Sequence, residues 1–230
     1  MNEAQPKKSD LGVRVASAVV MIAVAGSALW LGGDWWTWFI AIIAAVVLWE
    51  WWNLARKIAN TTFTTALWLI GGAIYVGLAV MALQVVRLEG GVAPVLTVIA
   101  TVIGVDVGAY FAGRMIGGPK IAPAISPNKT WAGLVGGIFG ATAITLLSHC
   151  FEAKNNSTLD TGGFGLALTG SAATAVVAQA GDFFESWMKR RAGVKDSGKI
   201  IPGHGGLLDR LDGLLAVLAV ASMIWLAFGQ

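Results

Sequence analysis

Residues 206–228 read GLLDRLDGLLAVLAVASMIWLAF, with two aspartates, Asp209 and Asp212, ahead of a stretch that carries no charge. An α-helix rises about 1.5 Å per residue, so about 20 apolar residues cross a hydrocarbon core of about 30 Å. The stretch therefore predicts a membrane-spanning helix that carries two carboxylates in its first turns.

Apolar runs of similar length recur along the whole chain. Of its 230 residues, 56% are hydrophobic and 13% are charged, against about 25% charged in soluble proteins. We expect an all-α, polytopic transmembrane helix bundle, formed by one domain over residues 1–230 with a cytoplasmic tail at 1–12. Seven spans are predicted, at 13–32, 35–54, 64–86, 92–114, 131–150, 162–187 and 206–228. The apolar run 15–31 is longer than the apolar core of a signal peptide, which has about 7–15 residues. This length favours an uncleaved first span.

The distribution of cations predicts the orientation. With the N-terminus in the cytoplasm, only Arg87 and Lys154 of the 16 lysines and arginines fall on the outer side, as the positive-inside rule requires. Tryptophans gather near the predicted span ends, which is typical of the membrane interface and does not favour a nucleic-acid partner. The single cysteine, Cys150, excludes an intramolecular disulfide.

Two predicted cytoplasmic segments, residues 106–133 and 182–213, contain more charged and polar residues than ordinary turns do. In the second, residues 182–213 read DFFESWMKRRAGVKDSGKIIPGHGGLLDRLDG. Asp182 lies near the end of the sixth span, and Asp209 and Asp212 lie near the start of the seventh. Ionisable groups within spans are costly and are functional candidates by default. Three carboxylates from two helix ends supply the oxygen ligands that Mg²⁺ prefers, so we predict a metal site there.

Clustered cations beside these carboxylates indicate a polyanionic ligand. The lysines and arginines of residues 189–199 surround the predicted metal site, and residues 203–206 place glycine backbone at a helix N-terminus, where phosphate binds well. Carboxylate-bound metal next to cations indicates phosphoryl-group chemistry. Three structural alternatives stay open: topology charge for the cations, an ion pair of the aspartates with Lys189 or Arg210, and an interhelical hydrogen bond for Asp106.

The same residues carry a family resemblance. The stretch 186–212 resembles, position for position, the signature of the phosphatidate cytidylyltransferases (CDP-diacylglycerol synthases). Residues 106–133 also resemble that family through DVGAY, GR and SPNKTWAG. Asn128 departs from the pattern, because a lysine is common at that position. The first three spans resemble the family only in hydropathy.

The resemblance implies the reaction CTP + phosphatidic acid → CDP-diacylglycerol + pyrophosphate, used in phospholipid synthesis. It implies Mg²⁺, with a second cation such as a monovalent ion, a homodimer, and an active site on the cytoplasmic face of a bacterial inner membrane. The expected catalytic residues are Asp182, Lys189, Asp209 and Asp212, the three aspartates being the metal ligands. The expected substrate-binding residues are Ser126, Lys129, Ser186, Arg190, Lys195, His204, Gly205 and Arg210.

Two other functions remain as alternatives. A CTP-dependent polyprenol or phytol kinase transfers the γ-phosphoryl group to a lipid alcohol. An ion-coupled transporter uses intramembrane carboxylates as ion ligands, but the outer halves of the last two spans, 166–173 and 216–228, carry no charge to continue such a path. No residue is identified that reads the cytosine base.

Overall fold

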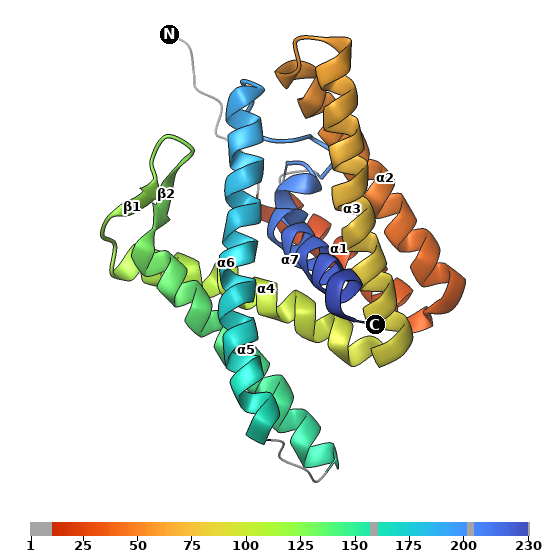
Figure 1. The fold of residues 1–230 in the computed structure, drawn as a ribbon, viewed down its shortest axis with the longest axis vertical. Helices are drawn as coiled ribbons and strands as arrows, with labels where there is room; N and C mark the ends of the chain where they lie inside the picture. Colours follow the sequence, from red (N-terminus) through yellow and green to blue (C-terminus); the bar gives the residue numbers. More distant parts are fainter. Residues whose placement is uncertain (1–10, 157–160, 202–204, 230) are drawn as a thin grey trace.

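The computed structural model describes residues 11–156, 161–201 and 205–229, which form seven helices and one short hairpin (Figure 1). The helices are α1 (Leu11–Leu31), α2 (Gly33–Ile58), α3 (Thr62–Gly90), α4 (Val92–Met115), α5 (Trp131–Asn156), α6 (Thr161–Arg191) and α7 (Leu208–Phe228). The strands β1 (Lys120–Ala122) and β2 (Ser126–Thr130) pair antiparallel. The predicted all-α class is confirmed, whereas the hairpin was not predicted. Residues 1–10 of the expected tail lie outside the described residues, and α1 begins at Leu11.

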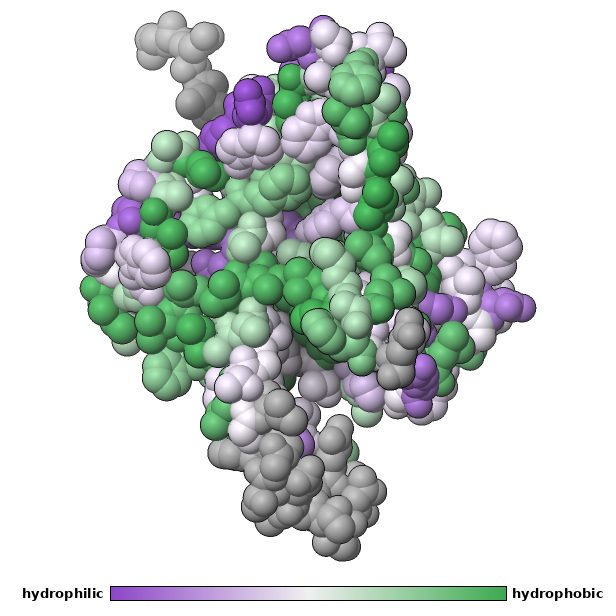
Figure 2. All heavy atoms as spheres, viewed as in Figure 1, coloured by the Kyte–Doolittle hydropathy of each residue, from purple (hydrophilic) through white to green (hydrophobic). Residues whose placement is uncertain are grey.

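Among the described residues, six helices, α1 to α5 and α7, are long and apolar enough to cross a membrane. Helix α6 carries buried Ser171 and Gln179 before it reaches Asp182 and Glu185, and its first residues are only partly described. Its role as a seventh span therefore stays a prediction. Figure 2 shows hydrophobic residues across the middle of one face and hydrophilic residues toward its edges.

Local sequence explains where helices begin and end. Thr61 and Thr64 form a reciprocal capping box at the start of α3, in which Thr61 Oγ1 accepts from Thr64 N at 3.2 Å. Gly91, at φ +80°, separates α3 from α4. Helix α3 continues unbroken through Gly72, where a Cβ atom would collide with the indole of Trp51. Gly72 therefore marks a close contact with α2.

Helices α4 and α5 approach each other backbone to backbone. A Cβ atom on Gly104 would lie 2.9 Å from the carbonyl oxygen of Gly140, and one on Gly136 would lie 2.5 Å from that of Gly108. Small residues allow such contact between membrane helices. The glycine face of α5 is therefore buried within the chain.

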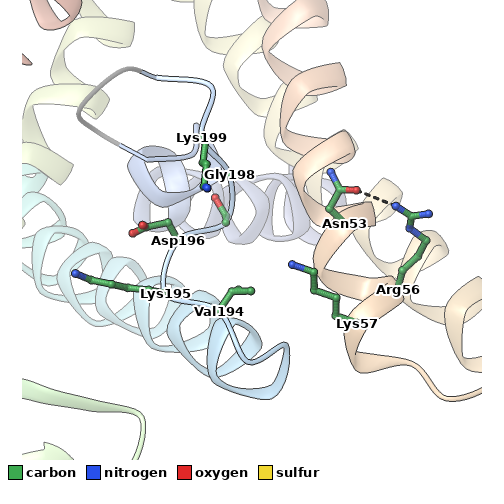
Figure 3. Close-up of a pocket in the computed structure, with 9 residues that line it drawn as sticks. Asn53, Arg56, Lys57, Val194, Lys195, Asp196, Gly198 and Lys199 are labelled. Atoms are coloured by element: carbon green, nitrogen blue, oxygen red, sulfur yellow. Dashed lines mark hydrogen bonds between the residues drawn. The ribbon is translucent and has the colours of Figure 1, made fainter. Parts of the chain in front are cut away.

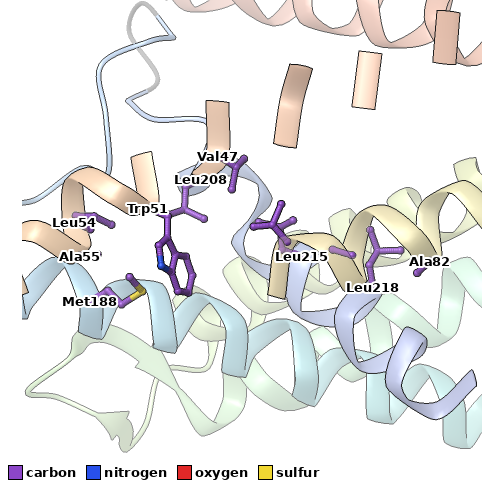
Figure 4. Packing of buried hydrophobic residues seen from close by; sticks show 11 residues of the cluster. Val47, Trp51, Leu54, Ala55, Ala82, Met188, Leu208, Leu215 and Leu218 are labelled. Atoms are coloured by element: carbon purple, nitrogen blue, oxygen red, sulfur yellow. The ribbon is translucent and has the colours of Figure 1, made fainter. Parts of the chain in front are cut away.

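Helix α7 packs against both α3 and α6, and lies between them in Figure 1. A hydrophobic core joins α2 to the ends of α6 and α7, and Figure 4 shows Trp51 and Leu54 beside Met188 and Leu208. Trp51 is only 4% exposed, so it belongs to this core and not to an interfacial belt. The α2–α3 connection, the end of α6 and the hairpin all lie toward the upper end of Figure 1, in agreement with their predicted location on one side of the membrane.

Candidate active site

The connection between α6 and α7 folds around the carboxylate of Asp209. Its Oδ1 lies 2.6 Å from the Nζ atom of Lys189, which also forms an ion pair with Glu185 one turn earlier on α6. Its Oδ2 accepts hydrogen bonds from Ser197 N at 2.8 Å, Ser197 Oγ at 2.9 Å and Gly206 N at 2.9 Å. The structure thus contains the ion pair with Lys189 that the sequence left as an alternative, and Asp209 ties the loop to both helices.

A second carboxylate holds the same loop from the opposite side. Glu50 on α2 is fully buried, and it accepts hydrogen bonds from Leu208 N at 2.7 Å and Leu207 N at 3.0 Å. It thereby satisfies backbone donors at the start of α7, where the helix dipole favours a negative charge. Ser197 Oγ lies 3.1 Å from Glu50 as well as 2.9 Å from Asp209. Because a hydroxyl has one hydrogen, it donates to one of the two carboxylates at a time.

The backbone phosphate site predicted at residues 203–206 stays a prediction, because residues 202–204 lie outside the described residues. The N–H groups of Gly206, Leu207 and Leu208 are already bound by Asp209 and Glu50. The anion at this helix N-terminus is therefore a side chain of the chain itself. Gly205, at φ +88°, shapes the turn before Asp209, and His204 lies outside the described residues.

Sequence reasoning missed Glu50, although a signal was present. It is the one acidic residue in the predicted second span, 35–54, and a carboxylate inside a span is a functional candidate by default. The packing around it is tight, because a Cβ atom on Gly206 would lie 2.8 Å from Glu50 Oε1.

A separate group of charges lies between α4, α6, α7 and the hairpin. Asp212 interacts electrostatically with Asp182, Asp106 and Lys129. The Nζ atom of Lys129 lies 2.5 Å from Asp182 Oδ2 and 4.4 Å from the centre of the Phe183 ring. Beyond this ion pair, no further hydrogen-bond partner is found for Nζ among the described residues. The group therefore combines three carboxylates with one ammonium that can still donate.

The structure separates the three predicted metal ligands into two environments. Asp182 and Asp212 interact with each other, whereas both oxygens of Asp209 already have partners. Within the described ranges, no three His, Cys, Asp or Glu side chains lie close enough to hold a metal ion. Asp182 and Asp212 fit Mg²⁺ in donor type, because it is commonly bound by one or two carboxylates with water and substrate phosphates.

A basic pocket of about 760 Å³ opens on the other side of the loop (Figure 3). Asn53, Arg56 and Lys57 on α2 form one wall, and residues 194–199 form the other. Figure 3 shows Lys57 extending toward the loop and Lys195 extending away from α2. The walls include four cations and one carboxylate, Asp196, so the pocket suits an anion.

The remaining predicted residues lie around these two centres. Arg190 donates to the carbonyl oxygen of Ile125 at 3.4 Å, which links the end of α6 to the hairpin. Ser126 begins β2 opposite Ala122. Ser186 is half-buried on α6, one turn after Asp182, and Arg210 is exposed on α7.

The α6–α7 connection, residues 192–207, is called the signature loop below. With this loop, Asp209, Glu50 and the charged group described, the chain can be compared with known proteins. Residues 58–228 match the model of the cytidylyltransferase family. The chain belongs to this family. A phosphatidate cytidylyltransferase of Brucella suis biovar 1 (strain 1330) is 32% identical over 96% of both chains. A Pseudomonas aeruginosa (strain PAO1) protein of the same name is 39% identical over 58% of this chain and 48% of its own length. A third, from Haemophilus influenzae (strain Rd), is 42% identical over 52% and 41%. Glu50 and the α2 wall of the basic pocket precede the residues that match the family model.

Proposed function

We propose that the chain transfers the cytidylyl group of CTP to phosphatidic acid and releases pyrophosphate. The relatives described above are phosphatidate cytidylyltransferases. The observation that carries the proposal is the position of the signature loop. It is held at Asp209 between a basic pocket and the helices that carry Asp182 and Asp212. A polyanionic nucleotide and a lipid phosphate need such neighbouring cations and carboxylates.

The reaction needs no general base. A phosphate oxygen of phosphatidic acid is already anionic at neutral pH, and it attacks the α-phosphorus of CTP. The bond from this phosphorus to the β-phosphate bridging oxygen breaks, and pyrophosphate leaves with the bonding electrons. The barrier arises from repulsion between two polyanions and from charge on the leaving group, so positioning and electrostatic stabilisation supply the catalysis.

Mg²⁺ is part of the proposal. Asp182 and Asp212 would hold it, and Asp209 is the third ligand that the resemblance implies. When bound, Mg²⁺ neutralises phosphate charge and favours departure of pyrophosphate. A second, monovalent cation at the same carboxylates completes the proposed cofactor set.

The cations of the chain have distinct proposed roles. Lys129 lies against Asp182 and offers its remaining hydrogens to a phosphate of the substrates. Lys57 and Lys199 attract the nucleotide phosphates to the basic pocket. Lys189 holds Asp209 and Glu185 until substrate binds, and then faces the leaving group.

The further substrate contacts are proposed from the resemblance. They are Ser126, Ser186, Arg190, Lys195, His204, Gly205 and Arg210.

We further propose a bacterial inner membrane location with the α6–α7 loop in the cytoplasm, where CTP is present. The relatives named above come from bacteria. We also propose a homodimer. The glycine face of α5 does not supply its interface, because α4 covers that face.

Product analysis tests the function. Purified protein in mixed micelles is given Mg²⁺, phosphatidic acid and CTP labelled at either the α- or the γ-phosphate. We expect the α-label in the lipid and the γ-label in pyrophosphate. A lipid kinase, supplied with polyprenol or phytol, would instead move the γ-label to the lipid and release CDP. Equal turnover with ATP would contradict the cytidine-specific part of the proposal.

A further inference from the structure

An apolar groove of about 390 Å³ runs between α3 and the neighbouring helices α2 and α6. Aromatic side chains form most of its wall: Trp51 from α2, Trp68 and Tyr75 from α3, and Phe184 from α6. Gly71 leaves its centre open, since nothing lies within 4 Å of a Cβ atom built there. Every residue that lines the groove is uncharged.

Two polar side chains of this wall already form hydrogen bonds within the chain. Trp51 Nε1 donates to the carbonyl oxygen of Trp68 at 2.8 Å, and Thr64 Oγ1 donates to that of Thr61 at 2.9 Å. A nucleobase pocket needs well-placed polar groups to read the base edge. With an uncharged, mostly aromatic wall and with Trp51 and Thr64 already hydrogen-bonded, this groove suits hydrocarbon.

The inner end of the groove reaches the charged group. Trp51, Tyr75 and Phe184 also line a small space whose other walls include Glu185 and Asp212. Tyr75 donates its hydroxyl to the carbonyl oxygen of Asp212 at 3.5 Å. The groove therefore adjoins this small space, and Trp51, Tyr75 and Phe184 form the wall that the two share.

The outer end of the groove lies on an exposed, apolar face of α3. Leu67, in its wall, is 53% exposed, and the neighbouring Ile70 is 57% exposed. Both lie on α3, whose length and hydropathy suit a membrane span. Such exposed apolar residues contact acyl chains when the helix lies in a bilayer.

We propose that this groove binds an acyl chain of the lipid substrate and so directs its phosphate toward Asp182 and Asp212. The inference rests on the proposed function, and it adds the surface that selects the apolar part of the substrate. Tyr75 and Phe184 mark the boundary between the hydrocarbon and the charged group.

Filling the groove tests this assignment, and α3 offers a matched control. Gly71→Leu places a side chain in the groove. Gly77→Leu places the same side chain on the same helix outside the groove, also with nothing within 4 Å of its Cβ. In micelles of fixed detergent-to-lipid ratio, we expect Gly71→Leu to raise the KM for dioleoyl phosphatidic acid about tenfold, the effect of about two methylene contacts. The KM values of Gly71→Leu for CTP and for dihexanoyl phosphatidic acid should stay unchanged. Gly77→Leu should keep the wild-type KM for all three substrates.

A second pair guards against misfolding of the glycine variant. Leu67→Trp narrows the groove mouth, and Leu96→Trp enlarges an equally exposed leucine on α4, 52% exposed against 53%. Leu67→Trp should reproduce the selective effect on the long-chain lipid, and Leu96→Trp should not.

The outcomes separate the two proposals. Wild-type protein that forms no CDP-lipid from either phosphatidic acid contradicts the proposed function. If the wild-type protein is active but the two members of each pair have equal KM values for dioleoyl phosphatidic acid, the proposed role of the groove is overturned. A shift of Gly71→Leu from dimer to monomer in size-exclusion chromatography, with no change in chain-length preference, also overturns it, because a second copy of the chain would then occupy the groove.

Discussion

Asp209 and Asp212 stand three residues apart on α7, yet their surroundings are opposite. Asp209 has an ion pair with Lys189 and accepts three hydrogen bonds from the signature loop. Among the residues that the structure describes, Asp212 accepts one hydrogen bond, from the adjacent Gly213 N, and it faces the like charges of Asp182 and Asp106. Spacing along a helix sets the direction of both side chains, but the elements packed against them decide their roles. Asp209 holds the loop, while Asp212 stays open to a cation.

Replacing the open aspartate should give the largest effect on turnover. We expect Asp212→Asn to lower kcat about 10²–10³-fold, because it removes charge that positions the phosphates. Thermal stability should not fall, since the substitution relieves repulsion with Asp182 and Asp106. CDP-diacylglycerol formation and thermal unfolding in detergent measure the two effects. Full turnover in a folded Asp212→Asn protein would remove this residue from the metal site.

Replacing the anchoring aspartate should affect stability as well. Asp209→Ala leaves Lys189 with only Glu185 as an ion-pair partner and frees the donors of Ser197 and Gly206. Such losses cost about 2–3 kcal/mol of unfolding free energy. Denaturant titration in detergent measures this loss. If Asp209→Ala unfolds like Asp212→Asn, the contrast between the two residues is wrong.

Glu50 sharpens the comparison from the side of α2. Glu50→Gln keeps one acceptor oxygen but turns an N–H₂ group toward the N-terminus of α7, so we expect a loss of about 1–2 kcal/mol. The matched control is Glu89→Gln, on an exposed residue of α3, which should change nothing. Equal unfolding midpoints for the two variants would mean that Glu50 does not hold the loop.

The smallest effect is expected in the basic pocket. Lys57→Gln removes an exposed cation from its wall and should raise the KM for CTP about threefold at low salt, with less effect at high salt because of screening. Lys120→Gln, on the exposed hairpin strand β1, provides the control. An equal change in both variants would show general surface charge and not a specific pocket.

The sequence predicted the helix bundle well, because each apolar run had to become a helix to satisfy its backbone in lipid. It also placed Asp182 and Asp212 together, since Asp182 lies near the end of the predicted sixth span and Asp212 near the start of the seventh. The division between Asp209 and Asp212 could not be predicted in this way. It depends on Glu50, which is 159 positions before Asp209, and on Ser197, whose hydroxyl contacts both. Such contacts arise from tertiary packing, which no local pattern records.

The position of Glu50 on α2 also has a consequence for protein engineering. The family match begins at residue 58, which invites construction of a minimal enzyme from that boundary. Such a fragment would discard Glu50 and leave the backbone of Leu207 and Leu208 without its carboxylate. A working minimal enzyme must therefore retain α2, so the smallest catalytic unit is larger than the region 58–228 that matches the family model.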